Sequence, residues 1–365
     1  MKVTFPHLGN ACFALKAIFD GLQIDYAIPP SSNRKALEIG SKYSPEEICL
    51  PFKIMLGNYI QGIENGADTI LSVGSCGPCR FGEYSELQMN ILKKLGYNLN
   101  FIIFDKPSSI GFMEFVNRFN KVSSQSSIKF KEKLNVLYKA YKIINIIDGI
   151  ESYCKLAAGY EVNKGIFKKV LNQCKDEAFY CNTPNNMIKH FKKYKTIIEH
   201  IPLDKSKKPI KVAIIGEIYT IIEPFSNLYI EDKLMDYGVS SIRKLSPSWW
   251  IKNTILGIFK ANSLDIKKIS KNYLPIPIGG YAKECIGEAL LAEKNGCDGA
   301  IQIMPMGCMP EIVSKSILPN ISKNKNFPIM TLVVDEMTGD AGYLTRIEAF
   351  LDLLERRQRN VLYGS

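Results

Sequence analysis

Short apolar segments alternate with segments of helical periodicity over the first hundred residues of the chain. The apolar segments have the length of strands and lie at residues 2–5, 24–28, 69–73 and 99–104. Helical spacing of apolar residues appears between them, at residues 10–21, 44–66 and 83–95. Strands and helices that alternate in this way predict βαβ units and a parallel sheet.

The same rhythm returns beyond residue 210. Apolar strands are predicted at residues 211–216, 299–304 and 328–334. Helices are predicted at residues 228–237, 282–295, 309–319 and 342–357. A second parallel sheet is therefore expected in the last part of the chain.

The segment between these two parts has a different pattern. Apolar residues recur there at helical spacing, as in Phe112, Phe115 and Phe119, and no clear strand stands out. The chain is therefore predicted to be an α/β protein with two Rossmann-like lobes, parallel sheets and a helical connecting segment. The expected domains are residues 1–107, 108–207 and 208–365.

Length and charge narrow the class of protein further. The 365 residues exceed one ordinary core, so about two domains are expected. No run of about 18 apolar residues predicts a membrane span, and the first residues do not resemble a signal peptide, so a cytoplasmic protein is expected. The net charge of +11 comes from dispersed lysines. This pattern favours a solvated helical surface over a nucleic-acid site.

Ten cysteines in such a chain require a chemical explanation. A disulfide framework is not expected in a large cytoplasmic protein, so metal binding or redox chemistry is favoured. Cys76, Cys79 and Cys308 each follow an apolar strand and precede a helix, and Cys49 lies early in the helix predicted at 44–66. Strand carboxyl ends line ligand crevices, and helix N-termini stabilise thiolates. An iron–sulfur cluster held by these four cysteines, in a cleft between the lobes, is the favoured interpretation.

Zinc and a redox dithiol are the alternatives. The CxxC formed by Cys76 and Cys79 also fits half of a zinc site, a dithiol or a structural turn. Structural zinc sites usually take a second local CxxC or a histidine pair, and the three histidines of the chain make no such pair. A dithiol at Cys76 and Cys79 would leave Cys49 and Cys308 unexplained.

Three charged residues lie close to these cysteines in the sequence. Lys53 and Arg80 are candidates to balance the charge of a cluster or to meet an anionic substrate, and solvation at the surface is the alternative. Glu311 lies in the first turn of the helix after Cys308, where we expect it to complement the helix dipole.

Four segments in order carry a resemblance to a known family. They are residues 46–53 (EEICLPFK), 74–84 (GSCGPCRFGEY), 304–311 (MPMGCMPE) and 335–350 (DEMTGDAGYLTRIEAF). They resemble the 2-hydroxyacyl-CoA dehydratase and benzoyl-CoA reductase family. More narrowly, they are similar to its single-chain branch related to acyl-CoA dehydratase activases, of which double-cubane cluster proteins are relatives.

The resemblance implies two Rossmann-like lobes around a [4Fe-4S] cluster or a double-cubane relative of it. It implies cluster ligands at Cys49, at one or both of Cys76 and Cys79, and at Cys308. In the dehydratases, an ATP-dependent activator with its own iron–sulfur cluster donates one electron, and the cluster then reduces a thioester substrate. The chain has no P-loop motif, so it would depend on such a partner for ATP.

The expected function is that of an anaerobic iron–sulfur redox protein. It would receive low-potential electrons from the activator and reduce a difficult acceptor, an acyl-CoA or another small molecule. A non-catalytic cluster-binding accessory of the activator system is the alternative, as is a zinc or dithiol protein. Because the dehydratases pair two related subunits, a lone chain suggests a homodimer or another role.

Overall fold

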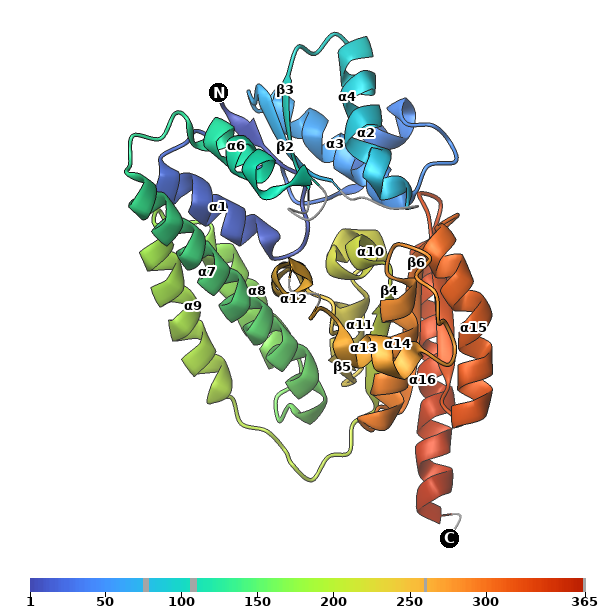
Figure 1. The fold of residues 1–365 in the computed structure, drawn as a ribbon. Helices are drawn as coiled ribbons and strands as arrows, with labels where there is room; N and C mark the ends of the chain where they lie inside the picture. Colours follow the sequence, from blue (N-terminus) through green and yellow to red (C-terminus); the bar gives the residue numbers. More distant parts are fainter. Residues whose placement is uncertain (75–78, 106–109, 259–260, 364–365) are drawn as a thin grey trace. The chain divides into compact units, whose positions relative to one another are not determined.

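The fold is taken from a computed structural model that describes residues 1–74, 79–105, 110–258 and 261–363 (Figure 1). Contacts within the chain divide it into two compact units. Unit 1 comprises Met1–Asp148, Cys174–Lys195 and Pro247–Asn262. Unit 2 comprises Gly149–Gln173, Thr196–Ser246 and Ser263–Ser365. Helices from the middle of the chain contribute to both units, and the three consecutive domains expected from the sequence stay a prediction.

Unit 1 contains a three-stranded parallel sheet. Its strands β1 (Val3–Thr4), β2 (Thr69–Val73) and β3 (Asn100–Phe104) lie in that order. The register of β2 and β3 runs from Thr69 opposite Asn100 to Val73 opposite Phe104. Three helices lie between β1 and β2 in the chain, and one lies between β2 and β3. They are α1 (Ala11–Leu22), α2 (Arg34–Tyr43), α3 (Leu50–Glu64) and α4 (Tyr84–Lys94).

The prediction of a strand at residues 24–28 is wrong. In the structure this segment forms only an isolated bridge between Val3 and Tyr26. The neighbouring strand β1 is two residues long, and Pro6 follows shortly after it without a backbone N–H. Because β1 is so short, residues 24–28 have no strand along which they could form a ladder of hydrogen bonds.

The helix expected at residues 44–66 also begins elsewhere. Ser44 ends α2, which the sequence pattern did not predict, and α3 begins at Leu50 with Cys49 as its N-cap. The Asn33 side chain caps α2 by accepting a hydrogen bond from the Ala36 N–H at 2.9 Å. The first turn of α3 carries Pro51, as expected where a backbone N–H has no helical partner.

Unit 2 contains a four-stranded parallel sheet with the order β5-β4-β6-β7. The strands are β4 (Lys211–Gly216), β5 (Ser240–Ile242), β6 (Gly299–Pro305) and β7 (Ile329–Val334). All seven residues of the central strand β6 are buried, as a strand with both faces covered requires. The long helices of this unit are α14 (Ala282–Lys294), α15 (Met309–Lys325) and α16 (Asp340–Tyr363), which Figure 1 shows beside the sheet.

Shorter elements complete unit 2. They are α10 (Ile218–Ile222), α11 (Ile230–Asp236) and α13 (Leu264–Ser270), together with the short strand β5. The sequence pattern predicted neither β5 nor α13. The strand β5 was missed because Ser240 and Ser241 do not form an apolar segment. The two parallel sheets with their helices confirm the predicted α/β class.

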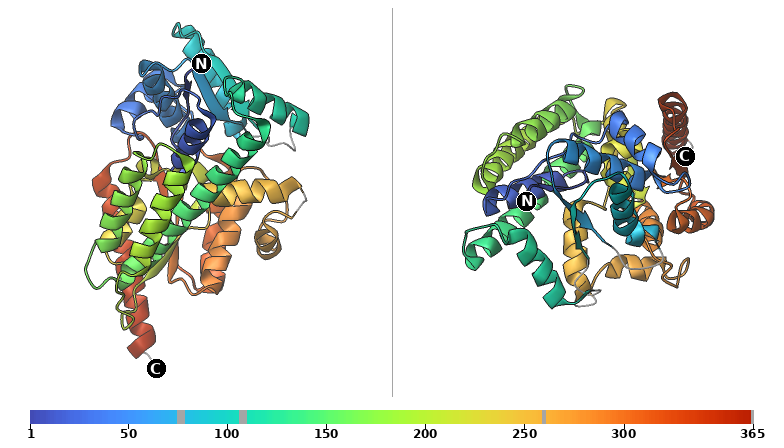
Figure 2. Two further views of the ribbon diagram at one scale, coloured as in Figure 1. Left: turned by 90° about the vertical axis from the view of Figure 1, so that its left-hand side faces the viewer. Right: turned by 90° about the horizontal axis from the view of Figure 1, so that it is seen from above.

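The middle of the chain is helical, as predicted. It contains α6 (Phe112–Ser123), α7 (Phe130–Ala157), α8 (Ile166–Ala178) and α9 (Pro184–Glu199). In unit 1, α7 and α9 pack beside α1, as Figures 1 and 2 show. A Cβ placed on Gly21 of α1 would lie 2.7 Å from Val136 of α7 and 3.1 Å from Pro184 of α9. Among the residues that the structure describes, no helix is long and apolar enough to cross a membrane.

Candidate functional site

Cys49 lies where the chain enters α3. It is the N-cap residue of this helix, its backbone is extended (φ −60°, ψ 144°), and its side chain is 6% exposed. The Arg80 guanidinium donates a hydrogen bond from Nη2 to the Cys49 sulfur at 2.9 Å. Arg80 also donates from Nη1 to the Glu47 carbonyl at 3.0 Å, which fixes the plane of the guanidinium. A guanidinium group and a helix N-terminus therefore meet at this one sulfur.

Cys79 lies next to this contact. It is the N-cap of the short helix η1 (Arg80–Glu83), its backbone is also extended, and its side chain is half-buried. Because Arg80 directly follows Cys79, the bond from Arg80 to Cys49 brings the two cysteine-bearing segments together within unit 1. Cys76, the other half of the CxxC motif, lies outside the described residues.

Lys53 and Arg80 are the two cations that lie close to these cysteines in the sequence. Lys53 is only 2% exposed, and its ammonium group donates to the Glu46 carbonyl at 3.0 Å. Lys53 is therefore not a solvated surface residue. Arg80 is exposed, and its guanidinium group is bonded to the Cys49 sulfur. The ring of Phe52 packs edge-on against Tyr84, with 5.1 Å between ring centroids, and so adds an apolar wall behind the first turn of α3.

Cys308 lies in unit 2, at the junction of β6 and α15 that the sequence predicted. It is the N-cap of α15 with an extended backbone and is 5% exposed. Gly307 precedes it at φ +70°, a conformation that favours glycine and lets the strand turn sharply into the helix. The Cys308 carbonyl accepts the first backbone hydrogen bond of the helix, from the Ile312 N–H at 2.9 Å.

The ligand set predicted from the sequence stays a prediction. Within the described ranges of the chain, no group of three or more His, Cys, Asp or Glu side chains is arranged to hold a metal ion. Cys49 and Cys79 come together in unit 1, Cys76 lies beyond the described residues, and Cys308 belongs to unit 2.

The other cysteines differ from Cys49 in their surroundings. All nine cysteines in the described part of the chain are free thiols. Burial raises the pKa of Cys174 to about 12 and that of Cys297 to about 11. Burial also raises the pKa of Cys285 well above its usual range. These core thiols hold their protons, as small apolar side chains do.

Glu311 lies in the first turn of α15, as expected, and its role at the helix dipole stays a prediction. Its side chain is fully buried under α15, and the Gln302 amide of β6 donates to its Oε2 at 2.8 Å. Burial raises the pKa of Glu311 to about 7. Sequence reasoning missed this because helical periodicity does not reveal which residue of a first turn faces the sheet.

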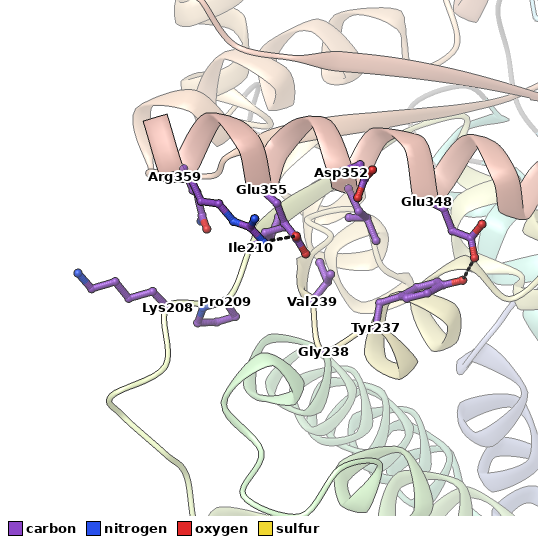
Figure 3. A pocket seen from close by; sticks show the side chains of 12 residues that line it. Lys208, Pro209, Ile210, Tyr237, Gly238, Val239, Glu348, Asp352, Glu355 and Arg359 are labelled. Carbon is purple, nitrogen blue, oxygen red and sulfur yellow. Dashed lines mark hydrogen bonds and ion pairs between the residues drawn. The ribbon is translucent and has the colours of Figure 1, made fainter. Parts of the chain in front are cut away.

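A cavity of about 460 Å³ lies at the opposite edge of the unit 2 sheet from Cys308. The segments that lead into β4 and β5 line it together with α16 (Figure 3). Most of the charged side chains that line the cavity are bonded to other side chains. Tyr237 donates to Glu348 at 2.6 Å, and Arg359 meets Glu355 at 3.4 Å. The cavity carries none of the predicted site residues.

Comparisons with known proteins assign no family to this chain. No protein-family model matches it, and no curated protein matches it.

Proposed function

We propose that the chain is an iron–sulfur redox protein whose cluster is held in unit 1 by Cys49 and Cys79. The observation that carries this proposal is the contact between the Arg80 guanidinium and the Cys49 sulfur, which joins the two cysteine-bearing segments. Cys76 and Cys308 are the further ligands expected from the sequence. A bound cluster supplies one-electron transfer.

The donor set of unit 1 fits such a group. Iron–sulfur clusters are held by thiolates, and N–H donors to sulfur raise their reduction potential. Cys49 is buried at a helix N-terminus and accepts such a donor, and Cys79 lies in the adjoining segment. The buried thiols Cys174 and Cys297 lack these features and keep raised pKa values.

The surrounding residues of unit 1 have separate tasks in this proposal. Arg80 offsets the negative charge of the thiolates and holds the segment after Cys79 against the start of α3. Lys53 adds a second, buried cation one turn into the same helix. Phe52 and Tyr84, which are buried and pack against each other, add apolar surface next to the start of α3.

The source of electrons and the acceptor follow from the family resemblance of the four sequence segments. We propose that an ATP-dependent activator with its own cluster delivers low-potential electrons, because the chain has no P-loop. The acceptor would be an acyl-CoA thioester or another small molecule that is difficult to reduce. In the alternative, the chain is a non-catalytic accessory that binds a cluster for the activator system.

Anaerobic reconstitution tests the cluster. The full chain is incubated with iron and sulfide, desalted, and assayed for bound iron, acid-labile sulfide and an EPR signal after reduction. We expect Cys49→Ala and Cys79→Ala to lower bound iron and sulfide at least several-fold. Cys76→Ala and Cys308→Ala decide whether these residues belong to the ligand set.

Cys181→Ala is the matched control, because Cys181 is a half-buried thiol of unit 1 outside the site. Its backbone N–H donates to Ala178 and its backbone carbonyl accepts from Lys16, and the substitution keeps both groups. Its iron and sulfide content should equal that of the wild type. Absence of iron and sulfide from the wild type after reconstitution would refute the cluster. Tight zinc binding, or a reversible disulfide between Cys76 and Cys79, would then support the zinc or dithiol alternative.

A second assay separates the enzyme from the accessory. The reconstituted chain is mixed with an ATP-dependent activator of the dehydratase type and a panel of acyl-CoA thioesters. ATP-dependent consumption of a thioester supports catalysis. Oxidation of the activator without turnover of any substrate supports the accessory role.

A further inference from the structure

Two glutamates lie in the interior of unit 2, between α14, β6 and α15. Glu288 of α14 is 4% exposed, and Glu311 of α15 is fully buried. Neither belongs to the proposed cluster site. Carboxyl groups are seldom this deeply buried without a paired cation, so their surroundings decide what they can bind.

The contacts of Glu311 come from β6 and α14. Gln302 donates from Nε2 to the Glu311 Oε2 at 2.8 Å and to its backbone carbonyl at 3.2 Å. The Gln302 Oε1 in turn accepts a hydrogen bond from Thr331 at 2.8 Å, so the amide nitrogen must face Glu311. The Cys285 thiol hydrogen-bonds the same carboxyl group. None of these partners is a cation.

Glu288 is more isolated. Neither of its carboxyl oxygens has a hydrogen-bond partner among the residues that the structure describes. The charged groups that face it are Arg243 and Lys244, from the segment after β5, and the acids Glu284 and Glu311.

Both of these cations are already engaged by other acids. Arg243 donates to Glu231 at 3.0 Å and to Glu151 at 2.9 Å, and Lys244 forms an ion pair with Asp265. Within the described chain, the two cations that face Glu288 are therefore paired with other acids, and neither donates a hydrogen bond to its carboxyl group.

An ionised carboxylate in this position would lose its hydration without gaining a partner. Such a group avoids the cost of burial by keeping its proton. Burial accordingly raises the pKa of Glu288 well above its usual range. Burial raises the pKa of Glu311 to about 7, and the nearby acids Glu217 and Glu284 add to the effect.

We propose that Glu288 and Glu311 form a proton-binding site in the core of unit 2, in which Glu288 is protonated and Glu311 is partly protonated in the folded chain at neutral pH. The protons are released when α14 separates from β6 and α15. The site is distinct from the proposed cluster ligands Cys49 and Cys79, which belong to unit 1. The chain takes up protons as it folds, and alkaline pH weakens the packing of these elements.

The direction of the pH dependence follows from the raised pKa values. The unfolded glutamates titrate near 4.5, whereas the folded state still binds their protons at higher pH. Because the folded state binds more protons, stability falls as pH rises from about 4.5 to about 7 for Glu311, and to higher pH for Glu288.

Infrared spectroscopy of the full chain tests whether the protons are there. We expect the carbonyl stretch of a protonated carboxyl group at pH 7, shifted on transfer to heavy water. Glu288→Gln and Glu311→Gln should each remove part of this band. Glu293→Gln is the control, because Glu293 lies on the same helix but near the surface, 3.9 Å from Lys325. The carboxylic acid band of this variant should equal that of the wild type.

Urea denaturation between pH 5 and pH 8 gives a second readout. The midpoint of the wild type and of Glu293→Gln should fall as pH rises, whereas that of Glu288→Gln should change less. If a variant does not fold, the wild type alone is decisive: its unfolding at pH 7 in weak buffer should release protons. No carboxylic acid band at pH 7 in the wild type, or no proton release on unfolding, would overturn the proposal.

Discussion

A single arginine distinguishes Cys49 from the core thiols of the chain. Cys49 and Cys174 are both buried, but only Cys49 is shown with a guanidinium donor, 2.9 Å from its sulfur. Burial, with smaller contributions from nearby charges, raises the pKa of Cys174 to about 12. The surroundings of Cys49, one of ten cysteines, therefore depend on a contact between residues 31 positions apart.

The charge of Arg80 should tune the proposed cluster. Arg80→Gln removes the cation and weakens the hydrogen bond to the Cys49 sulfur, so the midpoint potential should become more negative. Potentiometric EPR titration of the reconstituted chain measures this shift. Arg34→Gln removes the same charge from an exposed pair with Glu38 and should leave the potential unchanged. Equal shifts in both variants would contradict a local role for Arg80.

At the scale of elements, the close packing of α2 and α3 positions the start of the site. A Cβ on Gly40 of α2 would lie 1.7 Å from the Lys53 carbonyl oxygen, and one on Gly57 of α3 would lie 1.8 Å from the Ala36 carbonyl oxygen. The two helix backbones therefore touch at both glycines. Because Cys49 caps α3, any shift between these helices displaces its sulfur.

Gly40→Ala should separate these helices. The added methyl group meets backbone rather than a flexible side chain, so we expect a loss of at least ~2 kcal/mol in unfolding free energy. Gly149→Ala is the control, because Gly149 lies in α7, is exposed and has no atom within 4 Å of the position that an added methyl group would take. It should gain about 0.5–1 kcal/mol from higher helix propensity. Urea denaturation compares the two, and equal effects would contradict the packing argument.

At the scale of the whole molecule, a buried ionic network joins three distant segments of unit 2. Glu231 of α11 accepts hydrogen bonds from Lys155 of α7 at 2.5 Å and from Arg243 at 3.0 Å. Glu151 of α7 accepts a hydrogen bond from Arg243 at 2.9 Å and forms an ion pair with Lys155 at 3.3 Å. All four side chains are less than one-tenth exposed, so each charge depends on the others for compensation.

Glu231→Gln should leave two buried cations with one carboxylate. Breaking a buried ion pair in this way costs about 3–5 kcal/mol, and added salt should not diminish the effect. Asp236→Asn on the same helix removes an exposed pair with Lys168 and should cost less than about 1 kcal/mol. Chemical denaturation at low and high salt measures both. A loss of similar size in both variants would show that the network contributes little.

Apolar periodicity by itself determined the class of fold and much of its order. Strands at 69–73 and 211–216 were predicted where β2 and β4 lie, and Cys308 was expected at the junction that β6 and α15 form. Local pattern sufficed there because strand length and helix period are properties of neighbouring residues. The pattern was wrong at residues 24–28, where strand formation depends on a pairing partner, and at the start of α3, where the helix boundary depends on the cap.

Only the tertiary structure decided which groups meet. It brought Arg80 to the Cys49 sulfur, buried the carboxyl group of Glu311 in the first turn of α15, and left Glu288 without a hydrogen-bond partner in the described chain. These contacts join residues of separate elements, and no local period encodes them. The chemistry of a thiol or a carboxyl group depends on burial and on charges close by, so the packing of distant segments sets it.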